Sequence, residues 1–255
     1  MKRSFVLSSL TISLFFLQSC KKDILLDMNN VEMPNYEELV TTVNTKDTLK
    51  VLIIGNSITS HGVAKEIGWN HKSGMAATNY NKDFVHLLFE DFKKKNTDKN
   101  IILRYANYSN LERSPEKVNL KDSKIQNLYK FNPEYIVYQL GDNSTKANAD
   151  EFEKVSVKFL EGFKSSKKYV VSPYFMNVNN YKVTKNISTS SKSNFVDISY
   201  ISNNKKYSAN QYPGSIKKVW KAEGIAAHPG DLGMLLISQQ IFKKINPENQ
   251  QLSLQ

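Results

Sequence analysis

The sequence has a single cysteine, Cys20, in 255 residues, so no disulfide bond can form within the chain, even in an oxidising compartment. The apolar stretch from Phe5 to Leu17 is interrupted by serines and a threonine, and it is too short to cross a bilayer. The chain also contains no internal repeat, which excludes a repeat architecture. What remains is a globular fold that is held together by its own apolar core.

Three common kinds of site lack their sequence signatures. The four histidines and the aspartates do not have the spacing of metal ligands. The glycine-containing stretch after Ser57 lacks the lysine and the spacing of a phosphate-binding loop. The formal net charge is +11, but the lysines are scattered and form no basic stripe interleaved with aromatic residues. We therefore expect no metal, no cofactor and no nucleic-acid partner; the lysines form a solvated surface or one that attracts an acidic glycan.

The N-terminus has the features of a secretory signal. Lys2 and Arg3 precede the apolar stretch, which ends in the segment Leu17-Gln18-Ser19-Cys20. This segment resembles the lipobox of bacterial lipoproteins, which implies that Cys20 is lipidated and becomes the first residue of the mature chain. The alternatives are a plain signal peptide with an incidental cysteine, or an uncleaved anchor. We expect an exported protein, attached through lipid to the outer membrane, at the cell surface or on its periplasmic side.

The rest of the chain is organised as one domain. Hydrophobic residues make up 40% of the sequence, enough for a sizeable core. We expect a signal peptide over 1–19, a polar tether over 20–47 with a short helix near 36–43, one folded domain over 48–247 and a tail over 248–255. Strands alternate with helices along the domain, which predicts an α/β fold with a parallel sheet. The five predicted strands lie at residues 49–54, 101–105, 135–140, 169–171 and 195–198.

Helices are predicted between these strands, at residues 83–95, 123–129, 149–163 and 229–245, from apolar residues at helical spacing. The segment between Asn177 and Asn194 is rich in Asn, Ser and Lys, and it is either a loop or a poorly patterned helix. In parallel sheets of this type, ligands bind outside the carboxyl ends of the strands. Residues that directly follow the strands are therefore the candidates for a site.

Three short segments carry polar side chains at such positions. Two of them directly follow predicted strands and the third precedes the last helix; they are Gly55-Asn56-Ser57-Ile58-Thr59, Gly141-Asp142-Asn143 and His228-Pro229-Gly230-Asp231. Each is weak alone, since Gly-Asn-Ser after a strand is often only a turn and a lone histidine is more often structural. A serine, a histidine and a Gly-Asp-Asn segment in one chain are harder to explain by core packing.

Together the three segments resemble the signature motifs of the SGNH (GDSL-like) hydrolases, in the same order and over about 170 residues. Further pieces resemble a bacterial branch of that family, including Glu112-Arg113 after Asn107. The resemblance implies a three-layer α/β/α sandwich around a mostly parallel, five-stranded sheet. It also implies that Ser57 is the nucleophile of an ester hydrolase, that His228 is its base, and that the Ser57 N–H and the Asn143 side chain stabilise the oxyanion. Asn56, His61, Gly141 and Asp142 would line the pocket.

The chain departs from the family's pattern at two points. The oxyanion glycine of the family is missing after the second strand, where Asn107, or a main-chain N–H of Tyr108 or Ser109, would have to replace it. The family's aspartate, three residues before the histidine, is replaced by Ile225. Either Glu223 supplies the acid, or the enzyme works as a serine–histidine dyad whose imidazole is held by a backbone carbonyl.

The sequence therefore predicts a serine esterase of an extracytoplasmic substrate, most simply an O-acetyl or other short acyl ester on a carbohydrate, a choice that rests on the family. A lipid esterase or thioesterase is the alternative within the same chemistry. A glycan-binding surface lipoprotein that has the fold but no activity is the alternative from another class. The oligomeric state is left open.

Overall fold

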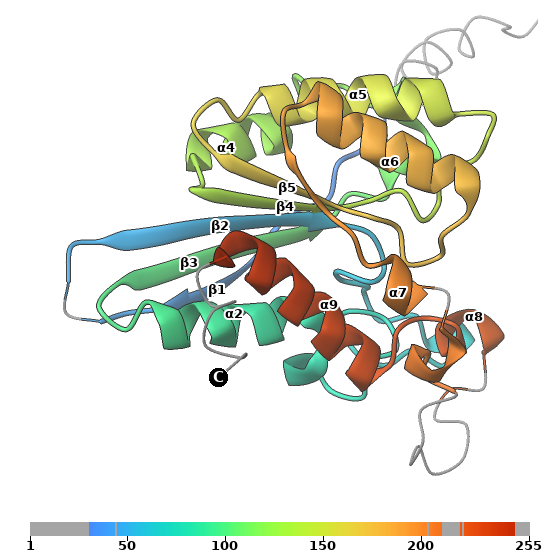
Figure 1. Ribbon diagram of the computed structural model, residues 1–255, viewed down its shortest axis with the longest axis horizontal. Coiled ribbons are helices and arrows are strands. Elements are labelled where there is room, and N and C mark those ends of the chain that lie inside the picture. Colours follow the sequence, from blue (N-terminus) through green and yellow to red (C-terminus); the bar gives the residue numbers. More distant parts are fainter. Residues whose placement is uncertain (1–30, 44, 203, 211–219, 221, 248–255) are drawn as a thin grey trace, which may run out of the picture.

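Figure 1 shows the computed structural model, in which a central sheet lies between two layers of helices. The structure describes residues 31–247 except 44, 203, 211–219 and 221. The predicted signal peptide, Cys20, the first part of the predicted tether and the tail over 248–255 lie outside the described residues. Within the described part, no helix is both long enough and apolar enough to cross a membrane.

The sheet has six strands in the order β1-β3-β2-β4-β5-β6, and all pairs are parallel except β1 with β3. The predicted α/β fold is confirmed, and the five predicted strands are present as β2 to β6. Their central positions are almost continuously buried, as expected for strands that are covered on both faces. The bounds are β2 Thr48–Gly55, β3 Asn100–Asn107, β4 Tyr135–Gln139, β5 Lys167–Val171 and β6 Asn194–Val196.

The sixth strand, β1 (Glu37–Thr41), corrects two predictions. The helix expected near 36–43 is wrong, because this segment pairs antiparallel with β3 at the edge of the sheet. The tether expected over 20–47 is also too long, since Met33 is already fully buried in the core. The sequence Glu-Glu-Leu-Val-Thr alternates between half-buried and exposed positions, as an edge strand does when one face is solvated.

Two helices cover one face of the sheet and three cover the other (Figure 1). α2 (Phe84–Lys95) and α9 (Asp231–Ile245) pack against each other on the first face. α4 (Ser123–Phe131), α5 (Ala149–Glu161) and α6 (Val178–Ser190) cover the second. Short helical turns complete the chain: α3 Asn110–Arg113, α7 Ser199–Ser202, α8 Glu223–Ala226, and 3₁₀ turns at Lys65–Ile67, Tyr80–Lys82, Pro115–Lys117 and Lys205–Tyr207.

Helix α6 resolves the alternative that the sequence left open for 177–194. The segment is a regular helix of 13 residues, despite its many polar residues. Its start is fixed by a capping box, in which the Asn177 side chain accepts from the N–H of Asn180 and the Asn180 side chain accepts from the N–H of Asn177. Val183 and Ile187 then supply the apolar face that packs on the sheet.

The strand register brings three chain segments to one edge of the sheet. Gly55 pairs with Asn107 on one side and with Gln139 on the other, so β2, β3 and β4 end at the same level. The residues that follow these strands therefore emerge next to one another. The predicted nucleophile, the segment after β3 and the Gly141-Asp142-Asn143 segment are adjacent for this reason.

Candidate active site

Ser57 lies in the turn that leaves β2. The turn begins at Gly55, where a Cβ atom would collide with the Thr59 side chain, so a glycine is required. Asn56 is fully buried and its side-chain oxygen accepts from the N–H of Ile58 at 3.0 Å. The carbonyl of Ser57 accepts from the N–H of Met75 at 2.8 Å. The serine backbone is thus fixed on both sides, while its hydroxyl remains at the edge of the sheet.

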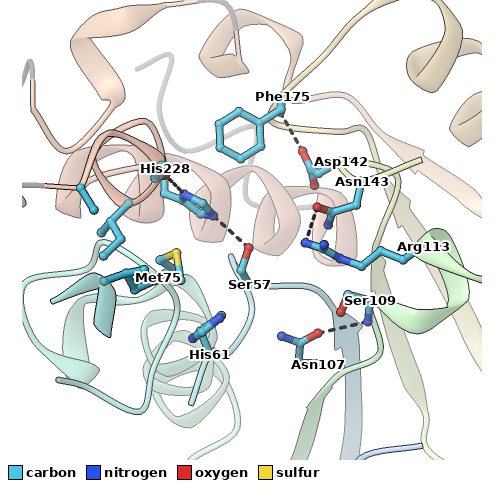
Figure 2. Close-up of a pocket in the computed structure, with 14 residues that line it drawn as sticks. Ser57, His61, Met75, Asn107, Ser109, Arg113, Asp142, Asn143, Phe175 and His228 are labelled. Atoms are coloured by element: carbon cyan, nitrogen blue, oxygen red, sulfur yellow. Dashed lines mark hydrogen bonds between the residues drawn. The ribbon is translucent and has the colours of Figure 1, made fainter. Parts of the chain in front are cut away.

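The hydroxyl of Ser57 is paired with the ring of His228. Ser57 Oγ lies 2.9 Å from His228 Nε2, and the opposite ring nitrogen, Nδ1, lies 2.6 Å from the carbonyl oxygen of Gly224. A carbonyl only accepts hydrogen bonds, so Nδ1 carries the hydrogen and Nε2 presents its lone pair to the serine. This is the tautomer that can take the proton of Ser57 (Figure 2).

Burial keeps the imidazole of His228 neutral. Burial, with a smaller effect of the nearby His61, lowers the pKa of His228 to about 4, against the opposing effect of the Gly224 carbonyl. The edge of the Phe175 ring packs against the imidazole, with ring centroids 5.0 Å apart and an interplanar angle of 81°. The base is therefore unprotonated throughout the physiological pH range.

Glu223 does not take the position of a catalytic acid. Nδ1 of His228 is occupied by the Gly224 carbonyl, and no hydrogen bond or ion pair joins Glu223 to His228 among the described residues. The carboxylate instead lines a neighbouring cavity. Asp231 is also directed elsewhere, because it binds the N–H and hydroxyl of Thr78 and the Lys82 ammonium. The geometry matches the dyad alternative and not the Glu223 alternative.

Both ends of the Asn143 amide are held by consecutive residues of α3. The Asn143 Nδ2 donates to a carboxylate oxygen of Glu112, and its Oδ1 accepts from Arg113 Nη2 at 2.7 Å. The other Glu112 oxygen accepts from the main-chain N–H groups of Gly141 and Asn143. The second hydrogen of the Asn143 NH₂ group has no acceptor among the described residues, so it can bind a ligand. The predicted oxyanion donor is thus rigidly oriented beside Ser57 (Figure 2).

Glu112 is a fully buried carboxyl group. Burial raises its pKa well above the usual range, the charge of Asp142 raises it further, and the hydrogen bonds from Asn143 and Gly141 oppose both effects. A buried carboxyl without an ion-pair partner is costly to ionise. Its two oxygens accept hydrogen bonds from Gly141 and Asn143 and so fix the loop after β4.

Asp142 connects the loop after β4 to the turn that bears the nucleophile. One of its oxygens accepts from Asn56 Nδ2 at 2.9 Å and from Gln139 Nε2 at 2.8 Å, while the other accepts from the N–H of Phe175 at 2.7 Å. Burial raises the pKa of this carboxyl too. Gly141 has a φ of 129°, which an L residue rarely adopts, so the glycine is needed to turn the loop.

The segment after β3 offers fewer main-chain donors than the sequence suggested. The N–H of Tyr108 donates to the Gly55 carbonyl at 2.7 Å, and the N–H of Ser109 donates to Asn107 Oδ1 at 3.1 Å. Neither is directed to the cavity. Asn107 Nδ2 donates to the Ser60 carbonyl at 2.8 Å and retains a second hydrogen. The N–H of Ser57 makes no hydrogen bond to another described residue.

These groups surround a cavity of about 520 Å³ (Figure 2). His61 and Asp142 line it as predicted, whereas Asn56 and Gly141 lie behind its wall and are not among the lining residues. The sequence reasoning assigned no role to Glu112, Arg113 or Phe175. The lining residues are Ser57, His61, Ile67, Met75, Asn107, Ser109, Arg113, Asp142, Asn143, Phe175, Ala222, Gly224, Ile225 and His228.

The other two histidines and the two tryptophans have structural positions. His71 packs against the rings of Trp69 and Trp220, outside the cavity, and both tryptophans are buried. His86 lies on α2 and is bound to Asp83 at 2.8 Å. In the described part of the chain, no group of three His, Cys, Asp or Glu side chains is arranged to hold a metal.

Comparison with solved structures relates this fold to known esterases. A two-domain esterase active on acetylated mannans, co-crystallised with mannopentaose, aligns with a TM-score of 0.52 at 15% identity over 79% of this chain and 50% of that one. A Bacteroides uniformis protein described as a GDSL-like lipase aligns with a TM-score of 0.48 at 16% identity, over 79% and 97% of the two chains. A family two carbohydrate esterase from Cellvibrio japonicus aligns with a TM-score of 0.46 at 12% identity, over 78% and 61%.

No family model matches the chain, and no curated protein sequence matches it significantly. The chain spans about half the length of the two-domain esterase. At these identities the likeness concerns the fold. The two-domain esterase shares the fold of this chain, and the layered α/β architecture that the three short motifs implied is confirmed.

Proposed function

We propose that this protein is a serine esterase that hydrolyses an O-acetyl or other short acyl ester on a carbohydrate through an acyl-enzyme on Ser57. The observation that carries the proposal is the 2.9 Å contact between Ser57 Oγ and an imidazole whose other nitrogen is bound to a carbonyl. A neutral, oriented histidine next to a serine is the arrangement that activates a hydroxyl for attack.

In the acylation step, Ser57 Oγ attacks the ester carbonyl carbon while its proton passes to His228 Nε2. The tetrahedral oxyanion that forms is stabilised by the N–H of Ser57 and the free hydrogen of Asn143 Nδ2, with Asn107 Nδ2 as a third donor. The imidazolium then protonates the alkoxy oxygen of the substrate. The C–O bond breaks, the alcohol leaves, and the acyl group remains on Ser57.

In the deacylation step, His228 takes a proton from a water molecule that attacks the acyl-enzyme. The same donors stabilise the second oxyanion. His228 then returns the proton to Ser57 Oγ, which releases the carboxylic acid and regenerates the free enzyme. The Gly224 carbonyl supports the imidazolium in both steps by accepting from Nδ1–H. A dyad of this kind needs no third carboxylate.

The choice of a carbohydrate ester is supported by two observations. Ile67, Met75, Ala222 and Ile225 form a small apolar part of the cavity, which suits an acetyl or similarly short acyl group better than a long fatty acyl chain. The polar lining residues Asn107, Ser109, Arg113 and Asn143 lie on the other side of Ser57 from Met75 and suit a hydroxylated alcohol moiety (Figure 2). The two-domain esterase with the same fold acts on acetylated mannans.

Covalent labelling tests the nucleophile directly. A fluorophosphonate probe is expected to modify Ser57 of the full-length protein, as located by peptide mass spectrometry. His228→Ala is expected to slow labelling by about 10²-fold or more, since the base is lost. The exposed Ser165 serves as an internal reference. Labelling of several serines at equal, His228-independent rates would contradict the proposal.

We also propose that the protein is exported and anchored through lipid on Cys20. The support is the sequence Leu17-Gln18-Ser19-Cys20 after a short apolar stretch. Metabolic labelling of bacteria with a radioactive or clickable palmitate is expected to label the wild type, and Cys20→Ala is expected to lose the label. Equal labelling of both proteins would contradict the anchor without bearing on the esterase.

A further inference from the structure

Arg113 is a cation at the edge of the catalytic cavity with most of its hydrogen-bonding capacity unused. The side chain lies at the end of α3 and is directed toward the region of Ser57 and Asn143 (Figure 2). Its guanidinium carries five N–H donors, and one of its nitrogens, Nη2, binds Asn143 Oδ1 at 2.7 Å. No other hydrogen bond or ion pair of the guanidinium is present in the described part of the chain.

The backbone that carries this cation is fixed by its surroundings. The N–H of Arg113 donates to the Ser109 carbonyl at 2.9 Å, and Asn148 Nδ2 donates to the carbonyl of Glu112 at 2.8 Å. The contact with Asn143 holds the far end of the side chain. A guanidinium that is oriented before the ligand arrives loses less conformational freedom on binding.

The nearby carboxyl groups of Glu112 and Asp142 do not pair with the Arg113 guanidinium. Glu112 directs both carboxylate oxygens to the Asn143 loop, and Asp142 directs both to Asn56, Gln139 and the N–H of Phe175. Neither forms an ion pair with Arg113 among the described residues. The other titratable residues that line the cavity are His61 and His228, which add no negative charge.

We infer that Arg113 binds a carboxylate on the alcohol part of the substrate, so that the preferred ester is an O-acylated acidic sugar. This inference rests on the proposed esterase function and names its substrate class. Met75 lies on one side of Ser57, where the acyl group would bind, and Arg113 lies on the other side with the polar residues Asn143 and Ser109 (Figure 2). The guanidinium is planar and only one of its hydrogen-bonding contacts is used, so two of its remaining N–H groups can bind a carboxylate in a bidentate fashion.

The test compares two acetylated methyl glycosides that differ only in charge: an O-acetylated hexuronide and the hexoside with CH₂OH in place of the carboxylate. The wild type is expected to prefer the hexuronide in kcat/KM by about 10- to 100-fold, the effect of one charge-assisted contact. Arg113→Gln is expected to abolish this ratio, and Arg113→Lys to retain part of it. Lys205→Gln, which removes a charge from the neighbouring cavity, is expected to retain it fully.

The same ratio in the wild type and in Arg113→Gln would overturn the inference. The esterase proposal would still stand after that result, provided that the wild type hydrolyses the glycosides and Ser57→Ala hydrolyses neither. A binding measurement covers the case in which neither glycoside is hydrolysed. Ligand-observed NMR with the deacetylated hexuronide and hexoside must then show binding of the hexuronide alone, abolished by Arg113→Gln; equal binding of both sugars would overturn the inference.

Discussion

His228 Nδ1 and the carbonyl oxygen of Gly224 lie 2.6 Å apart, four residues from each other along the chain. The contact exists because α8 is a single short turn that places the Gly224 carbonyl under the imidazole. It provides the acceptor that a carboxylate provides in a triad. A main-chain group therefore orients the imidazole, and we expect the adjacent Glu223 to be dispensable.

Replacement of Glu223 tests this arrangement. Glu223→Gln is expected to keep kcat/KM within about twofold of the wild type, because a side chain outside the catalytic hydrogen bonds removes no transition-state interaction. Hydrolysis of p-nitrophenyl acetate measures the effect. A loss of about 10⁴-fold, as expected when a triad acid is removed, would reassign Glu223 to the catalytic group.

The pH dependence of catalysis should reflect the buried base. Only the neutral imidazole can accept the serine proton, so activity falls as the pH drops through the pKa of His228, which burial lowers to about 4. We expect kcat/KM to stay level from about pH 8 to pH 5.5 and to decline below that, provided that circular dichroism shows a folded protein. A decline centred near the ordinary histidine value of about 6.5 would contradict the burial.

Asn143 should contribute to the transition state rather than to substrate binding. Asn143→Ala is expected to reduce kcat by about 10²–10³-fold with a small change in KM, as is usual for the loss of one oxyanion donor. Steady-state kinetics with a short acyl ester separates the two constants. An increase in KM at constant kcat would instead indicate a role in ground-state binding.

Glu112 should act through Asn143. A glutamine at this position has one oxygen and one NH₂ group, so it cannot accept both from Asn143 Nδ2 and from the two main-chain N–H groups. At pH 8, where Glu112 with its raised pKa is ionised, Glu112→Gln is expected to lower kcat by about 10-fold or more, the effect of a misplaced donor. Glu116→Gln, an exposed carboxyl in the next turn, is the matched control and should leave kcat unchanged. Equal kcat values in both variants would show that Glu112 does not act in catalysis through Asn143.

The same residue should affect the stability of the fold as a function of pH. Burial raises the pKa of Glu112, so the native state retains its proton at pH values where the unfolded chain, with an ordinary pKa of about 4.3, has lost it. This contribution to the free energy of unfolding is therefore present at low pH and is lost as the pH rises above about 4.3. Urea denaturation from pH 5 to pH 8 is expected to show a smaller decline in Glu112→Gln than in the wild type. If the free energy of unfolding varied with pH in the same way in both proteins, a raised pKa of Glu112 would be excluded.

Much of the fold was predictable because apolar residues recur with clear periods. The buried strands β2 and β4 are short apolar runs, and α9 carries apolar residues at helical spacing. β1 was missed because an exposed edge strand has too few apolar residues to differ from a polar tether. α6 was ambiguous because its start depends on the side chains of Asn177 and Asn180 rather than on hydrophobicity.

The site was predictable where short motifs fall at strand ends. Ser57 and Asn143 were predicted in this way, and the sheet register brings their segments together, whereas His228 comes from the segment before α9. Glu112 and Arg113 belong to a segment that resembles the family, but their contacts with Asn143 depend on how α3 packs against the loop after β4. Sequence spacing does not encode such a contact between segments 30 residues apart.

Hydrolysis of p-nitrophenyl acetate by the full-length protein, beside Ser57→Ala and His228→Ala, tests the central claim most directly. The wild type is expected to turn over the ester, and each variant is expected to lose at least about 10³-fold in kcat, because the two residues act as a unit. Circular dichroism establishes that all three proteins are folded. A folded wild type that is no faster than its two variants, on this ester and on acetylated sugars, would contradict the serine esterase and favour a protein that only binds glycans.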